Sequence, residues 1–145
     1  MFKHILIPTD GSDLSRKAVL YGMQLASTTG ARVTAITVME PYRVASMESV
    51  LVAETVEEHD AEVAASADRA LEQVKMAGEA ASVPVETLRE MNDTPYRAII
   101  GCALANACDL IVMASHGRRG VAALLLGSET TNVLTHSTIP VLVYR

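Results

Sequence analysis

The chain has few aromatic residues and little cysteine, and both shortages limit the fold classes and kinds of site that it can have. Only 3% of its 145 residues are aromatic, although half are hydrophobic. The apolar content is therefore mostly Ala, Val, Leu, Ile and Met, which suits helices packed on a sheet. Cys102 and Cys108 lie six residues apart, a spacing that favours neither a metal site nor a disulfide. We expect two buried structural thiols.

The sequence also lacks long apolar runs and basic clusters. No run approaches the roughly 18 apolar residues of a membrane span, and the first ten residues lack the hydrophobic region and cleavage site of a signal peptide. We therefore expect a cytoplasmic protein without a membrane span. With a net charge of −5 and no basic run, nucleic acid is not an expected partner. The length fits one domain, residues 1–145.

Strand and helix patterns alternate along the chain. Strands are predicted over 3–8, 32–39, 83–89, 109–114 and 139–144, and helices over 14–28, 58–80, 95–106 and 128–135. Strict alternation predicts an α/β fold: an open five-stranded parallel sheet with right-handed crossovers and helices on both faces. Residues 41–56 have no clear period and are predicted to form a long connection.

Periodicity also predicts which side chains are buried. The first helix should bury Leu14, Ala18, Tyr21, Gly22, Leu25 and Ala26. The last helix should bury Val133 and Leu134. The spacing of His4, His59 and His136 does not suit a metal site, so these histidines are expected at the surface or at an interface.

Two loops carry chemically distinctive residues. Pro8-Thr9-Asp10-Gly11 follows the first strand, and the loop that begins at Ala114 follows the fourth. Ligands of open α/β sheets bind beyond the carboxyl ends of the strands, where the strand order reverses. If these two strands are neighbours, the loops meet there. The second loop ends at Gly127-Ser128, where free N–H groups of a helix start favour an anion.

The glycine spacing of the second loop resembles a known nucleotide-binding signature. Ala114-Ser-His-Gly117, nine residues and then Gly127-Ser128 is similar to the pattern of the universal stress protein family, and both chain ends resemble that family too. The resemblance implies a Rossmann-like or adenine nucleotide alpha hydrolase-like fold with strand order 3-2-1-4-5. It also implies a homodimer through the last strand, 139–144, and a stress-response or signalling role with an unidentified downstream partner.

The resemblance further implies that an adenine nucleotide (ATP, ADP or AMP, with or without Mg²⁺) binds between the loops. The matching residues are Pro8, Thr9, Asp10, Val38, Met113, Ala114, Gly117, Arg118, Gly127, Ser128, Glu129 and Thr130, and His116 is a further candidate. Val38 would offer backbone groups to adenine, and Asp10 would meet ribose hydroxyls or a cation. Gly117 would let the backbone approach the phosphates, and the helix start at Ser128 would bind them.

Several of these residues have simpler interpretations. Ala114 replaces the first glycine of the signature, so its methyl group either crowds the ribose or is harmless at a negative φ. Asp10 also suits a turn that leads into a helix, and Gly127-Ser128 a helix cap. Arg118, Arg119 and His116 also suit a solvated loop.

These features favour a nucleotide-dependent switch over an efficient enzyme, because the loops offer no evident general base or water-positioning group. Binding is expected to order residues 115–127 and 41–56. Slow hydrolysis or autophosphorylation remains compatible with the loops. The alternative is an adenylyl-transferring or ATP-hydrolysing enzyme on a related fold. Such enzymes need further catalytic groups, such as paired histidines after the first strand. A receiver or flavin-binding module is a weaker alternative. A receiver needs an acidic pair near its phospho-accepting aspartate, and Asp10 stands alone after the first strand.

Overall fold

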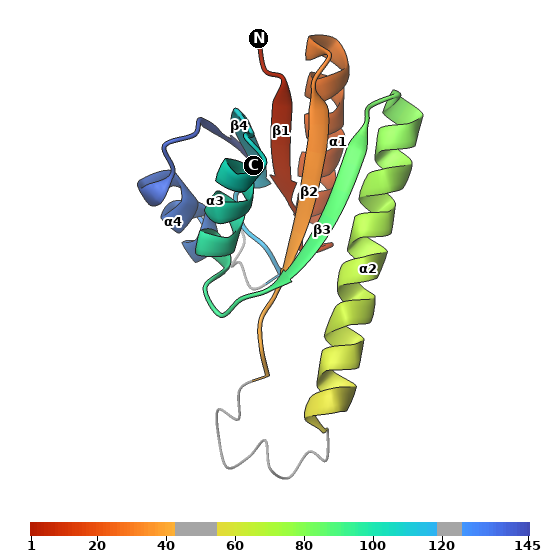
Figure 1. Ribbon diagram of the computed structural model, residues 1–145, viewed down its shortest axis with the longest axis vertical. Helices are drawn as coiled ribbons and strands as arrows, with labels where there is room; N and C mark the ends of the chain where they lie inside the picture. The colour runs from red at the N-terminus through yellow and green to blue at the C-terminus, as the bar shows by residue number, and fades with distance from the viewer. Residues whose placement is uncertain (43–54, 119–125) are drawn as a thin grey trace.

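The computed structural model describes residues 1–42, 55–118 and 126–145 (Figure 1). In this part the elements are β1 (His4–Pro8), α1 (Asp13–Thr29), β2 (Arg32–Met39), α2 (Val56–Ala81), β3 (Val85–Met91), α3 (Pro95–Ala105), β4 (Leu110–Ala114), α4 (Ser128–His136) and β5 (Val141–Tyr144). The strands pair in parallel in the order β3-β2-β1-β4-β5. The predicted fold class and strand order are confirmed. The ordering predicted for 115–127 and 41–56 concerns segments that fall largely outside the described residues.

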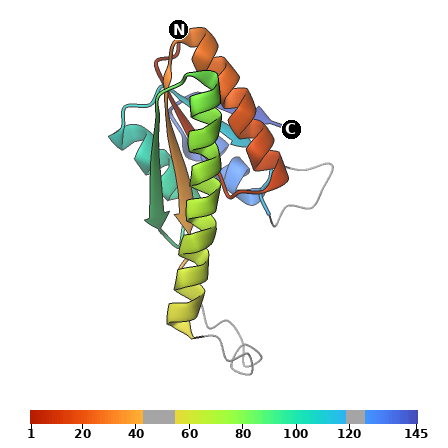
Figure 2. The ribbon, with the colours of Figure 1, turned by 90° about the vertical axis from the view of Figure 1, so that its right-hand side faces the viewer.

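Helices cover both faces of the sheet, α1 and α2 on one side and α3 and α4 on the other (Figures 1 and 2). Alternation along each strand divides the core between these faces. Ile5 and Ile7 pack with α1 and α2, whereas Leu6 packs with α3 and α4. Cys102 and Cys108 are buried free thiols on the second face, as expected.

Local signals fix the ends of α1. The Ser12 hydroxyl caps its start by accepting a hydrogen bond from the Ser15 amide at 3.3 Å. Gly30 ends the helix at φ 71°, in the left-handed region that glycine tolerates best. Both ends lie within a residue of the prediction. They fix where the chain leaves β1 and where it re-enters the sheet.

The structure corrects three burial predictions. His4 is not at the surface: it is only 4% exposed, because it shares the face of Leu6 and its Nε2 lies 2.7 Å from Thr34 Oγ1. Tyr21 is 41% exposed. The buried face of α1 is centred on Gly22, where any Cβ would overlap Ile7, so the face includes Met23 instead. Leu134 is 42% exposed, because α4 buries Thr130 and Val133 and Leu134 lies a step around the helix.

Candidate functional site

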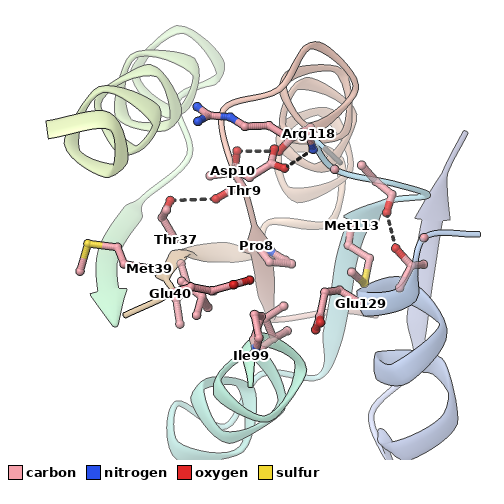
Figure 3. Close-up of a pocket in the computed structure, with 18 of the residues that line it drawn as sticks. Pro8, Thr9, Asp10, Thr37, Met39, Glu40, Ile99, Met113, Arg118 and Glu129 are labelled. Atoms are coloured by element: carbon pink, nitrogen blue, oxygen red, sulfur yellow. Dashed lines mark hydrogen bonds between the residues drawn. The ribbon is translucent and has the colours of Figure 1, made fainter. Parts of the chain in front are cut away.

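A pocket of about 700 Å³ opens at the carboxyl ends of β1, β2 and β4 (Figure 3). Its volume falls in the range of small-molecule sites, ~300–1,000 Å³. The pocket exists because Pro8, the last residue of β1, pairs with Ile36 while β2 continues to Met39. All thirteen site residues predicted from the sequence line it, and their roles as ligand contacts stay predictions.

Buried hydroxyl groups hold the loop after β1. The Thr9 amide donates to the Ile36 carbonyl at 2.9 Å, and the Thr37 hydroxyl donates to the Thr9 carbonyl at 2.8 Å. The Thr9 hydroxyl lies 2.6 Å from the hydroxyl of Ser15, in the first turn of α1. The loop is thus tied to both β2 and α1, so the pocket floor is preformed.

The Asp10 carboxylate joins the two predicted loops. Its Oδ1 accepts from the Ser12 amide at 2.9 Å and its Oδ2 accepts from the Arg118 amide at 2.8 Å. The first bond is the turn interaction that the sequence allowed for Asp10. The second explains Gly117, because a Cβ there would overlap Asp10 Oδ2. Gly117 is therefore required by a contact inside the protein, whether or not a ligand is bound.

The start of α4 faces the pocket without a side-chain cap. Gly127 is its N-cap residue, and the Gly127 amide donates to the Ser115 carbonyl at 2.7 Å. A Cβ on Gly127 would lie 3.1 Å from His116 Cα, so a larger residue would push the loop away. The Thr130 hydroxyl fixes the other side by donating to the Ala114 carbonyl at 2.9 Å. The first-turn amides and the helix dipole are thus available to an anion.

The backbone of β2 lies open to the pocket at Val38. The Ile36 carbonyl bonds toward β1, and the Met39 carbonyl accepts from the Asn92 amide at 2.9 Å, on the β3 side. Because the backbone groups of successive strand residues point to opposite sides, those of Val38 point toward the β1 side. There β1 has already ended at Pro8. Val38 therefore presents a donor and an acceptor to the pocket.

Ala114 does not have a positive φ, which is the condition under which its methyl group was expected to be harmless. Among the described residues, the only non-glycine residues with positive φ are Ser82 and Ala107. Ala114 ends β4 and is 9% exposed. Its backbone conformation therefore does not require glycine.

Charged side chains differ between the two ends of the pocket. Near Asp10, the Arg118 guanidinium donates to the Ser66 hydroxyl of α2 at 3.2 Å. Near α3, Glu129 Oε2 is buried without a hydrogen-bond partner. Burial raises the pKa of Glu129, a hydrogen bond from the Tyr96 backbone amide lowers it, and the charge of Glu40 raises it further.

Sequence reasoning missed the pocket wall formed by α2 and α3. The further lining residues are Ser15, Ile36, Thr37, Met39, Glu40, His59, Val63, Ser66, Ala67, Pro95, Ile99 and Leu126. Those of α2 belong to a stripe that a helix on a sheet would bury anyway. Met39 and Glu40 could have been found, since they lie at and just after the end of a strand that ends beside the switch point.

Within residues 1–42, 55–118 and 126–145, no group of three or more His, Cys, Asp or Glu side chains could hold a metal ion. No helix in the same ranges is long and apolar enough to cross a membrane.

Comparisons with known proteins agree with this geometry. The family model described as "Universal stress protein family" matches residues 1–145. A universal stress protein of Methanocaldococcus jannaschii is 33% identical, with 100% of this chain and 83% of that protein covered. UspA from Lactobacillus plantarum superposes with a TM-score of 0.83 at 25% identity, covering 99% of this chain and 97% of that one.

A third relative was solved with a nucleotide. It is a universal stress protein in complex with cAMP, 26% identical, with a TM-score of 0.69 and coverage of 99% of this chain and 97% of that one. The family model thus matches the full sequence of a chain whose strand order is β3-β2-β1-β4-β5 and whose loop after β4 has the glycine spacing of the signature. The chain belongs to the universal stress protein family.

Proposed function

We propose that this pocket binds an adenine nucleotide, ATP, ADP or AMP, and that the bound state acts as a signal. The observation that carries the proposal is the pairing of an uncapped helix start, at α4, with an open strand backbone, at Val38, across one preformed pocket. The cAMP complex of a relative supports the ligand class.

The phosphates belong at the start of α4. The amides of Ser128, Glu129 and Thr130 provide the positive end of the helix dipole. Arg118 lines the same pocket, and its guanidinium, which now donates to Ser66 of α2, would turn toward the phosphates because a guanidinium binds phosphate oxygens well. Mg²⁺ would be held mainly by the phosphates with at most one carboxylate, Asp10, which is a common arrangement for this ion.

The base belongs at the other end. The donor and acceptor of Val38 suit the edge of adenine, and the apolar side chains of Ile99 and Met113 suit its faces. The ribose then lies between Asp10 and Ala114. This pose keeps the phosphates away from the carboxylates of Glu40 and Glu129.

Nucleotide binding acts as a switch through Arg118. Its guanidinium now holds Ser66 of α2. A phosphate group would attract it away, because a charge-assisted bond is stronger than a bond to a neutral hydroxyl. A downstream protein in the cytoplasm would then distinguish the two states. The chain acts as a homodimer, paired through the edge strand β5.

The direct test is mass spectrometry of the nucleotide released from freshly purified, heat-denatured protein, followed by calorimetric titration with ATP in the presence and absence of Mg²⁺. We expect a released adenine nucleotide and saturable binding. Gly117→Val should abolish binding and Ser128→Ala should weaken it. No released nucleotide and no calorimetric signal would reject the proposal. Rapid multiple turnover of ATP would instead favour an enzyme.

A further inference from the structure

Tyr96, in the first turn of α3, contacts the short helix α4 near both of its ends. The two helices lie side by side on one face of the sheet (Figure 1). α4 has nine residues and buries Thr130 and Val133. A helix of this length is not stable by itself in water, so its position depends on the groups it packs against. The start of α4 lines the pocket, whereas Tyr96 does not.

The backbone of Tyr96 binds the first turn of α4. Thr94, the cap residue of α3, makes no side-chain hydrogen bond, and Pro95 has no amide hydrogen. The Tyr96 amide instead donates to the Glu129 carboxylate of α4. Figure 3 shows the Glu129 side chain pointing toward the helix that carries Ile99, which is α3. An acidic side chain of one helix thus caps the start of the other.

The ring of Tyr96 contacts the last turn of α4. It stacks on the His136 imidazole, with ring centroids 4.9 Å apart and an interplanar angle of 27°. The ring is half-buried and packs against the apolar cluster that contains Val133. Glu129, Val133 and His136 are spaced at i, i+4 and i+7, which places them on one face of a helix. Tyr96 therefore contacts this face of α4 from its first turn to its last.

These contacts fix the direction in which the first-turn amides of α4 point. On the other side of the helix start, the Thr130 hydroxyl donates to the Ala114 carbonyl at 2.9 Å. One hydrogen bond fixes a point on α4 but not the direction of its axis. The contacts of Tyr96 at both ends fix that direction as well. The amides are thus aimed at the pocket before a ligand arrives, which lowers the cost of binding.

We propose that Tyr96 is a positioning residue for the phosphate end of the pocket, acting through α4 without touching the ligand. The inference rests on the proposed function and deepens it. Without the Tyr96 ring, the end of α4 loses its contact with His136 and the helix can tilt. A tilt would move the amides away from the phosphates, but it would leave the backbone of β2 at Val38 in place for the base. A nucleotide should therefore lose affinity where a nucleoside does not.

The test compares ATP with adenosine, which has the same base and ribose but no phosphate, by calorimetric titration. Tyr96→Ala should lower ATP affinity about tenfold, comparable to the loss of one hydrogen bond to a charged group, and should leave adenosine affinity unchanged. Tyr96→Phe keeps the ring and removes only the hydroxyl, which accepts from Arg97 Nε at 3.3 Å. It should retain the wild-type ATP/adenosine ratio. His136→Ala removes the stacked partner on α4 and should lower this ratio as well.

The matched control is Tyr21→Ala, which removes a ring of α1, on the opposite face of the sheet, whose centroid lies 5.7 Å from that of Tyr144. It should leave the ratio unchanged. An unchanged ratio in Tyr96→Ala that is folded by circular dichroism would overturn the inference and leave the proposed function standing. Should Tyr96→Ala fail to fold, an unchanged ratio in His136→Ala would overturn it. Failure of the wild-type protein to bind either ligand would instead reject the proposed function.

Discussion

At the scale of single residues, Asp10 and Gly117 form one unit. The Asp10 carboxylate binds the backbone of both loops, and Gly117 leaves room for it. Gly117→Ala should therefore break the bond to the Arg118 amide and lower ATP affinity by about tenfold or more, close to one charge-assisted bond. Calorimetric titration measures this. Gly101→Ala is the control, because a Cβ at Gly101 meets nothing within 4 Å. It should leave affinity unchanged.

His4 is a single residue that makes stability depend on pH. Burial and the nearby Arg32 charge lower its pKa, so the native state keeps the ring neutral. The unfolded chain binds a proton near pH 6.5. The contribution of His4 to the free energy of unfolding is therefore fully present above that pH, and it falls as pH decreases toward the lower native pKa.

Denaturant titrations between pH 7.5 and 5 should show this loss of free energy of unfolding in the wild-type protein. His4→Gln should reduce the slope, because residue 4 can then no longer bind a proton. His136→Gln changes an exposed histidine and should keep the slope. Equal slopes in the wild type and His4→Gln would contradict this account.

At the scale of elements, the end of α3 is strained. Ala107 lies at φ 53°, and the Cys108 amide donates to the Ala103 carbonyl at 2.8 Å. This is the helix ending that glycine usually occupies. Ala107→Gly should raise the free energy of unfolding by about 1 kcal/mol, because a left-handed conformation is unfavourable for alanine. Ala105→Gly, at the last residue of the same helix, where φ is not positive, should instead lower it. Thermal or chemical unfolding distinguishes the two.

The order and type of the elements were predictable because each has a local signal. Ser12 and Gly30 bound α1, and Thr94-Pro95 begins α3. The orientation of a helix on the sheet was not predictable in the same way. The close approach of Gly22 to Ile7 rotates α1 so that Tyr21 faces outward, and this depends on a strand that precedes the helix in sequence. His4 was mistaken for a surface residue because a strand end gives no sign of what will cover it.

At the scale of the whole molecule, β5 is an edge strand, and the proposed homodimer would depend on which of its amides point outward. The Ile111 amide donates to the Pro140 carbonyl and the Ser115 amide donates to the Tyr144 carbonyl. Even-numbered residues of β5 thus bond to β4, and Val141 and Val143 point away from it.

Val143→Pro should therefore remove an outward donor and convert a dimer to a monomer while preserving the fold, since proline is tolerated at sheet edges. Leu142→Pro should instead break the β4 pairing and destabilise the protein. Sedimentation velocity at micromolar concentration reports the first effect and thermal unfolding the second. A wild-type protein that sediments as a monomer would contradict the proposed pairing.

The candidate site was predictable as far as the loops that follow strands. Residues such as Asp10 and Ser128 lie next to glycines that mark turns in the sequence, and they line the pocket. The pocket wall formed by α2 was not predictable, because Ser66 and Ala67 face the pocket only through the packing of a long helix across the sheet. The missed residues are thus those whose position depends on tertiary arrangement.

The pocket wall draws on both helical layers, since Val63 and Ser66 come from α2 and Pro95 and Ile99 from α3. Among the residues that the structure describes, the two layers form separate clusters of buried side chains on opposite faces of the sheet. A bound ligand would therefore join two regions that could open independently, and it would slow amide hydrogen exchange in helices that do not touch each other's core. The empty protein would then have two cooperative units, and the occupied protein one.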